Sequence, residues 1–223
     1  MNGTLIVIEG LDGSGKSTQV KLLSERFNRE KIEFKQIKLP DYEDESSTLV
    51  RMYLAGEFGK KPEDVNIYAA SSFYAVDRYA SFKRHWSKEY LEGTVILADR
   101  YTTSNAVHQT VKLPKEQWEE YISWLTDYEY VRMGIPKPDC VIYLDMPVEI
   151  SQRLMTERYE GDEVKKDIHE ANVGYLLKCR EAALFAADKL GWSVIKCSDG
   201  DNPLPREVIA ETIYTEIKKK IGR

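Results

Sequence analysis

The sequence lacks any apolar run near the roughly 20 residues that a membrane-spanning helix requires. Its amino-terminal stretch, MNGTLIVIEG, has no basic leader and only a short apolar run, so we expect neither a signal peptide nor a membrane anchor. These absences predict a cytoplasmic protein that has no membrane partner.

Cysteine is scarce, and net positive charge is missing. Cys140, Cys179 and Cys197 stand too far apart for the CxxC spacing of zinc or redox sites, so we expect them to be thiols of the core. The formal net charge of −5 argues against a general polyanion-binding surface, and therefore against a nucleic-acid partner. Any phosphate site must be local.

Linkers, internal repeats and low-complexity segments are also missing. The composition, with 42% hydrophobic and 31% charged residues, is that of an ordinary globular protein. At 223 residues, we expect one domain over 1–223, with insertions, instead of two complete domains.

Short apolar runs that are mostly rich in Val and Ile predict five buried strands. They cover residues 4–8, 34–38, 94–98, 140–144 and 192–196. Helical spacing predicts helices at 15–28, 62–91, 114–132, 147–158, 166–190 and 204–221, and Pro62, Pro114 and Pro147 each suit a first helical turn. This alternation predicts an α/β fold with a parallel sheet covered on both faces, which binds ligands at the carboxyl ends of its strands.

The stretch IEGLDGSGKST matches the phosphate-binding pattern G-x-x-x-x-G-K-[ST] between a strand and a helix. Gly10, Gly13 and Gly15 let successive N–H groups surround phosphate oxygens at a helix amino terminus. Lys16 would reach the β and γ phosphates, and the Ser17 hydroxyl would bind Mg²⁺. An ordinary glycine-rich turn would not explain the Lys16-Ser17 pair. The residues expected to bind a nucleoside triphosphate are Gly10, Gly13, Ser14, Gly15, Lys16, Ser17 and Thr18.

A second polar pair, Asp99-Arg100, ends the third predicted strand. The Asp99 carboxylate could hold the water shell of magnesium, and the planar fork of Arg100 could clamp a second phosphate. The alternative is an ion pair that simply ends a strand.

Five segments together resemble the thymidylate kinases: EGLDGSGKSTQ, the helix with FYAVDR, DRYTTSNAV, KPDCVIYLD and the region of RLMTERYE. The resemblance covers nearly the whole chain. It implies a three-layer P-loop NTPase fold with a five-stranded parallel sheet and a mobile lid, here at about 153–168. It also implies ATP and Mg²⁺ as cofactors, dTMP as the acceptor, and a homodimer. The N-K-x-D-type guanine reader expected of switch GTPases does not occur.

By this resemblance, one helix face would read the acceptor base. Tyr74 and Arg78 lie four residues apart, so the ring would stack on the pyrimidine while Arg78, which can only donate, would meet thymine O4. The alternative is an amphipathic helix with a core aromatic and a solvated arginine. Asn105 matches a residue at the base edge, Ser104 lies near the sugar and phosphate, and Asp12 would position the acceptor. The implied acceptor residues are Asp12, Tyr74, Arg78, Asp99, Arg100, Ser104, Asn105 and His108.

The chain departs from the family pattern at three places. His108 stands where members often have an aromatic residue near the deoxyribose. This difference leaves it open whether the site excludes a sugar with a 2′-hydroxyl. A surface position for His108 is an equal alternative. Gly13 stands where some members have a basic residue, so we expect the lid to supply that charge through Arg153 and Arg158. The loop at 41–45 is acidic where relatives commonly have an arginine, and Arg51 could take over by reaching back.

The lid itself has alternatives. Lys165 and Lys166 could contribute charge, Glu170 matches an acidic residue near a metal in some relatives, and the whole stretch could be a solvated, mixed-charge helix end.

The favoured hypothesis is an ATP- and Mg²⁺-dependent kinase that converts dTMP to dTDP in nucleotide biosynthesis. The alternatives are a kinase for another (deoxy)nucleoside monophosphate and a non-catalytic P-loop regulator. The predicted catalytic residues are Lys16, Asp12, Arg100, Arg153 and Arg158, with Ser17 and Asp99 at the metal.

Overall fold

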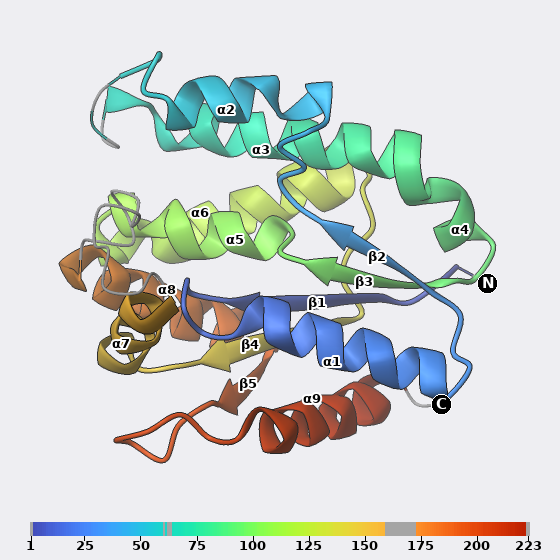
Figure 1. Cartoon of the computed structure of the whole chain (residues 1–223). Helices are drawn as coiled ribbons and strands as arrows, with labels where there is room; N and C mark the ends of the chain where they lie inside the picture. Colours follow the sequence, from blue (N-terminus) through green and yellow to red (C-terminus); the bar gives the residue numbers. More distant parts are fainter. Residues whose placement is uncertain (1, 60, 62–63, 159–172, 222–223) are drawn as a thin grey trace.

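The computed structural model describes residues 2–59, 61, 64–158 and 173–221, and its centre is a five-stranded sheet (Figure 1). All neighbouring strands are parallel, in the order β2-β3-β1-β4-β5. The α/β fold with a five-stranded parallel sheet is therefore confirmed, and each predicted strand is present with small shifts at its ends. The strands are β1 (Leu5–Gly10), β2 (Phe34–Lys38), β3 (Val95–Asp99), β4 (Cys140–Asp145) and β5 (Ser193–Lys196).

The helices agree less closely with the expected ranges. They are α1 (Lys16–Arg29), α2 (Thr48–Leu54), α3 (Ile67–Ser81), α4 (Ser87–Leu91), α5 (Thr102–His108), α6 (Trp118–Thr126), α7 (Val148–Arg158), α8 (Val173–Leu190) and α9 (Arg206–Ile221). The short helices α2 and α5 lie outside the predicted ranges. Helix α5 contains the β-branched pair Thr102-Thr103, which is unfavourable for a helix, so long-range contacts hold it in place.

The predicted helix over 62–91 is confirmed from Ile67 to Leu91, but it is not α-helical throughout, and Pro62 lies outside the described residues. Helix α3 begins at Ile67, where the Asn66 side chain accepts hydrogen bonds from the first-turn N–H groups of Tyr68 and Ala69. A π-helical segment, Phe82–Trp86, then separates α3 from α4. This wider turn brings Phe82 and Trp86 into the core, where their rings pack edge to face at 4.6 Å. A second π-helical segment, Asp127–Arg132, ends the predicted helix at 114–132.

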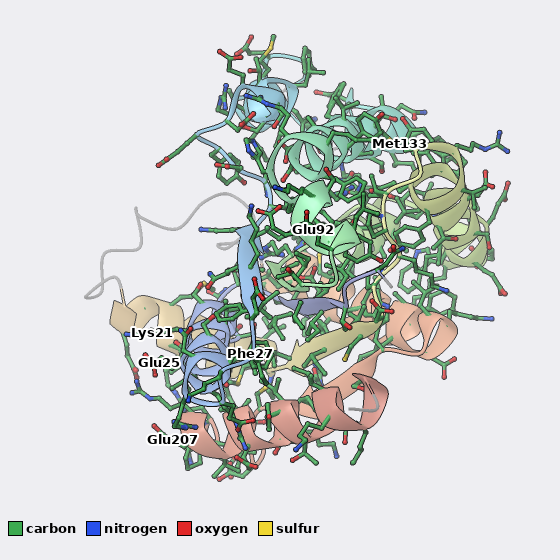
Figure 2. All side chains as sticks on the ribbon, turned by 90° about the vertical axis from the view of Figure 1, so that its right-hand side faces the viewer. Lys21, Glu25, Phe27, Glu92, Met133 and Glu207 are labelled. Carbon is green, nitrogen blue, oxygen red and sulfur yellow. The ribbon has the colours of Figure 1, made fainter. Side chains whose placement is uncertain are left out.

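Strand β1 is buried along its whole length, and its successive side chains point alternately into the cores on the two faces of the sheet. Ile6 and Ile8 pack with residues of α1 and α9, whereas Leu5 and Val7 pack with the aromatic cluster after α3. Helices thus cover both faces of the sheet (Figure 1). In Figure 2, Phe27 lies on the inner side of α1, and the exposed Lys21 and Glu25 lie on its outer side.

The parallel strands all end at one edge of the sheet (Figure 1). β1 leads into the phosphate-binding loop, and β3 leads through Arg100 into α5. The three cysteines are buried, as expected of core thiols. Among the described helices, none has the length and apolar character to cross a membrane.

Candidate active site

The loop between β1 and α1 requires glycine for steric reasons. Gly13 and Gly15 have φ values of 78° and 90°, in the left-handed region. A Cβ on Gly13 would lie 2.6 Å from the Ser151 carbonyl oxygen, and one on Gly10 would lie 2.5 Å from Ser14 Oγ. Among the described residues, Ser14 Oγ is buried and has no hydrogen-bond partner. A glycine cradle with an unsatisfied hydroxyl at a helix amino terminus fits a bound phosphate.

Lys16 folds back over this loop. Its Nζ donates to the carbonyl oxygens of Gly10 at 2.8 Å and Leu11 at 3.0 Å, and it lies 3.5 Å from Asp12 Oδ1. The side chain is buried, and burial together with the nearby Arg100 lowers the pKa of Lys16 from its ordinary value. A buried ammonium in the phosphate-binding loop is suited to meet the anionic end of a nucleotide.

Arg100 stands at the junction between β3 and α5 in a strained backbone conformation. Its φ is 69°, unusual for a residue with a side chain and frequent at functional sites. NH2 donates to Asp12 Oδ1 at 2.6 Å, while NH1 contacts Glu9 Oε1 at 3.2 Å and Ser104 Oγ at 3.3 Å. Arg100 therefore joins the phosphate-binding loop to α5.

Glu9 is a site residue that the sequence analysis missed. Its side chain is fully buried, and it accepts hydrogen bonds from Thr103 Oγ1 and Ser104 Oγ, both at 2.7 Å, and from Gly10 N at 2.9 Å. An acidic residue inside the apolar run LIVIEG, directly before the glycine loop, was the signal that could have revealed it.

The carboxyls of this cluster differ in their pKa. Burial alone would raise the pKa of Asp12 and Glu9, but Arg100 and Lys16 lower both below their usual values. Asp99, buried at the end of β3, has a raised pKa because burial dominates over the attraction of Lys16. Asp12 and Glu9 are consequently anionic at neutral pH.

A cavity of about 310 Å³ opens beside Arg100. It brings together every predicted acceptor residue except Asp99. Several tyrosines contribute to its wall, and Tyr74 packs edge to face against Tyr53 at 6.3 Å. The lining residues that the sequence analysis had singled out are Asp12, Tyr74, Arg78, Arg100, Ser104, Asn105 and His108.

Arg78 is not the solvated arginine of the alternative interpretation. It is 3% exposed, and its guanidinium forms two 2.6 Å hydrogen bonds with the carboxylate of Glu129, a second residue that the sequence analysis missed. No feature of the segment TDYEYVR had distinguished Glu129 from a surface acid. Asn105 Nδ2 donates to Ser71 O at 3.2 Å and lies 3.5 Å from Glu129 Oε1.

His108 lies in the wall of the cavity and not on the outer surface. Its Nε2 is 3.3 Å from Arg100 NH1, which can only donate, so Nε2 accepts and the proton of the neutral ring is on Nδ1. Nδ1 is 3.7 Å from Cys179 Sγ, and the ring stacks on Tyr175 with centroids 6.4 Å apart. Burial and the charge of Arg100 lower the pKa of His108 to about 4.

This lowered pKa predicts that acid destabilises the protein through His108. Between the usual value of 6.5 and about 4, the unfolded chain binds a proton that native His108 does not, so the free energy of unfolding falls as the pH falls. The loss reaches at most about 3.5 kcal/mol, at roughly 1.4 kcal/mol for each pKa unit. Urea titrations of the wild type and His108→Gln across this range would measure it. Equal slopes for the two proteins would contradict the assignment.

Other predicted residues lie away from the cavity. Arg51 does reach back from α2, but NH1 donates to the carbonyl oxygens of Tyr42 at 2.7 Å and Asp44 at 2.9 Å, so it ties the acidic loop instead of lining the cavity. Arg153 NH2 donates to Asp201 O at 3.0 Å and Asn202 Oδ1 at 3.3 Å, in the loop after β5.

The predicted lid is largely outside the described residues. Arg158 ends α7, but its side chain, like Lys165, Lys166 and Glu170, falls outside the described part. Ser17 lies exposed in the first turn of α1, while Asp99 pairs with Ile8 in the sheet register. Within the described ranges, no group of three or more His, Cys, Asp or Glu side chains could hold a metal by itself.

Comparison with known proteins identifies one family. A family model described as thymidylate kinase matches residues 8–203. The thymidylate kinase of Mycobacterium tuberculosis is 29% identical over 185 residues, covering 82% of this chain and 84% of the relative. A probable thymidylate kinase of Pyrococcus horikoshii is 34% identical over 155 residues, covering 69% and 70%.

A solved structure shares the fold over nearly the whole chain. The thymidylate kinase of Candida albicans superimposes with a TM-score of 0.70 at 22% identity, covering 98% of this chain and 92% of that one. At this identity the likeness concerns the fold alone. It shows that the five-stranded sheet and its helices belong to the P-loop NTPase fold.

Proposed function

The chain belongs to the thymidylate kinase family, and we infer from this membership and the site that it transfers the γ-phosphoryl group of ATP to dTMP, giving dTDP and ADP. The observation that carries this proposal is the 2.6 Å bond between Arg100 and Asp12. Through this bond, Arg100 in the cavity wall contacts Asp12 of the phosphate-binding loop. A donor phosphate in the loop and an acceptor phosphate at Arg100 would then face each other, and such proximity is the main requirement of phosphoryl transfer.

On the donor side, the loop residues from Gly10 to Thr18 would hold ATP, with Lys16 at the β and γ phosphates. Ser17 and Asp99 would hold Mg²⁺, which supplies positive charge between the phosphates. Two separated oxygen ligands suit Mg²⁺, because this ion keeps several waters and phosphate oxygens in its shell. The absence of a larger ligand cluster among the described residues is compatible with such a site.

On the acceptor side, Arg100 would clamp the phosphate of dTMP, and Asp12 and Ser104 would position it. The acceptor is itself an anion, so no strong general base is needed. The Tyr74 ring would stack on thymine, and Arg78 would donate to its O4. Asn105 and His108 would complete the wall beside the base and the sugar.

The remaining expectations are also proposals. We propose that 1–223 is one domain with a lid at about 153–168, and that Arg153 and Arg158 bring positive charge to the transferred phosphoryl group when it closes. We further propose a cytoplasmic homodimer. A stripe of exposed apolar side chains on α3, namely Tyr68, Val76 and Tyr79, supports an interface there.

A kinase for another monophosphate is the second candidate, and His108 favours it. A neutral imidazole in the cavity wall could exchange its contact with Arg100 for a hydrogen bond to a sugar hydroxyl, which a phenylalanine ring at this position could not form. The proposal of dTMP and this alternative therefore differ in the acceptor and not in the chemistry.

An ADP-release assay with ATP, Mg²⁺ and separate acceptors distinguishes these functions. We expect the highest kcat/KM with dTMP among dTMP, dUMP, dCMP, dGMP and UMP. For dCMP we expect a loss of about tenfold or more, because the amino group of cytosine would face the donors of Arg78 and leave them unsatisfied.

The other outcomes identify the alternatives. A higher kcat/KM with UMP or dGMP than with dTMP would establish a different monophosphate kinase. ATP binding without turnover of any acceptor would establish a non-catalytic regulator.

A further inference from the structure

Arg78 and Glu129 form a buried pair with a defined orientation. Nε of Arg78 donates to Oε2 of Glu129 and NH2 donates to Oε1, both at 2.6 Å, with side-chain exposures of 3% and 0%. NH1 contacts only the Tyr101 carbonyl oxygen at 3.4 Å among the described residues, a long and weak hydrogen bond. The carboxylate therefore engages one edge of the guanidinium and leaves NH1 as the main remaining donor.

Glu129 is in turn held by the helix that carries much of the cavity wall. Thr102 Oγ1 donates to Glu129 Oε2 at 3.0 Å, and Asn105 Nδ2 lies 3.5 Å from Oε1. Both residues belong to α5, as do Ser104 and His108. Glu129 itself lies in the π-helical segment Asp127–Arg132, an irregularity that is frequent at functional sites. Its carboxylate thus links α3, which carries Arg78, to α5.

The pair also decides the charge of this part of the cavity. A buried guanidinium without a partner is strongly unfavourable and would attract an anion. Arg78 lines the cavity, whereas Glu129 is not among the described lining residues. Glu129 neutralises Arg78 from the side that does not line the cavity. A ligand in the cavity therefore meets the N–H donors of Arg78, while the Arg78–Glu129 pair as a whole has no net charge. Such a surface suits the carbonyl edge of an uncharged base better than it suits a phosphate.

We propose that Glu129 is a positioning residue that fixes Arg78 with NH1 toward the base, and thereby sets the preference for a pyrimidine with a carbonyl at position 4 over one with an amino group. Glu129 acts through Arg78 and does not touch the substrate. This inference rests on the proposed function, since it requires dTMP to occupy the cavity lined by Arg78.

Glu129→Gln tests the inference in the full-length protein. The amide keeps the volume of the side chain but turns one acceptor into a donor, so it cannot accept both hydrogen bonds from Arg78. We expect KM for dTMP to rise about tenfold or more while kcat stays within about threefold. The ratio of kcat/KM for dTMP to that for dCMP should fall about tenfold, and KM for ATP should not change.

Asp127→Asn is the matched control, because it removes a carboxylate from the same segment. Asp127 pairs with Arg132 in an exposed ion pair, with side-chain exposures of 44% and 72%. An exposed pair contributes little, so we expect wild-type kinetics for both acceptors. Glu129→Asp is a second variant, for use if Glu129→Gln does not fold. It retains the buried negative charge, so we expect it to fold. Its carboxylate is one methylene short of Arg78, so the dTMP to dCMP ratio should again fall.

The outcomes separate this inference from the proposed function. An unchanged dTMP to dCMP ratio in the folded Glu129 variants, with a wild type that phosphorylates dTMP, would overturn the positioning role alone. If KM for ATP and KM for dTMP rose equally in the Glu129 variants, the role of Glu129 would be structural only, and the positioning role would be wrong. A wild type without turnover of dTMP would overturn the proposed function, and this inference with it.

Discussion

Lys16→Met is expected to lower kcat by about a thousandfold or more while the protein remains folded. Lys16 folds over the loop, and its Nζ group would supply positive charge to the phosphates of ATP held by the N–H groups of that loop. Charged groups that stabilise a transferring phosphoryl group contribute on this scale. Methionine has nearly the same length and lacks the charge, so it removes the interaction without leaving a large gap.

The stability of this variant should stay close to that of the wild type, because two effects oppose each other. Burial makes the charged form of Lys16 unfavourable, as its lowered pKa indicates, and an apolar side chain removes this cost. The same substitution removes a positive charge that lowers the pKa of Asp12 and Glu9. Urea unfolding and the ADP-release assay measure the two quantities separately.

Lys21→Met provides the control for Lys16→Met. Lys21 lies on the same helix, 78% exposed, at 4.0 Å from Glu25. Its removal should change neither stability nor turnover appreciably. Turnover of Lys16→Met within tenfold of the wild type would contradict the role given to the phosphate-binding loop.

Arg100→Gln is expected to have the largest combined effect, on stability and on turnover. Glu9 is fully buried, and Arg100 is its principal positive partner together with Lys16. Removing one member of a buried pair leaves an uncompensated charge and typically costs about 3 kcal/mol or more. We therefore expect a loss of this size in the free energy of unfolding, along with a fall in kcat/KM for dTMP of about a hundredfold or more.

Two further variants separate these effects. Arg100→Lys keeps the charge but loses the planar fork that reaches Asp12, Glu9 and Ser104 together, so it should fold well and still lose most of the activity. The double variant Arg100→Gln/Glu9→Gln should recover most of the stability, because no buried carboxylate then lacks a partner. Recovery of activity in the double variant would show that Arg100 serves only to neutralise Glu9.

Several parts of the site follow from neighbouring residues in the sequence. The spacing from Gly10 to Ser17 specifies a phosphate-binding loop because each glycine meets a local backbone requirement, and the structure shows φ values of 78° and 90° at two of them. The inner strands β1, β3 and β4 were likewise identified by nearly continuous apolar runs, since a strand buried on both faces needs no partner to be recognised. The edge strands β2 and β5 are partly exposed and have shorter apolar patterns. Local patterns also indicated that Arg100 follows a strand at the carboxyl edge.

Long-range pairing could not be derived in this way. Glu9 and Arg100 are 91 residues apart and Arg78 and Glu129 are 51 apart, and no local spacing relates them. The π-helical segments were missed for a related reason, because the expected helical spacing continues through Phe82 and Trp86 until core packing widens the turn. His108 could be assigned to the cavity wall only after α5 and α8 had been placed side by side, with His108 stacked on Tyr175.

The sequence by itself determined the α/β fold class, the strands, the loop that would hold ATP and the family. The tertiary structure alone decided which carboxylate compensates each buried cation, that Arg51 binds the acidic loop instead of lining the cavity, and that His108 is neutral. Local backbone conformation depends largely on neighbours in the chain, which a sequence displays. Charge compensation and pKa depend on neighbours in space, which only the folded chain brings together.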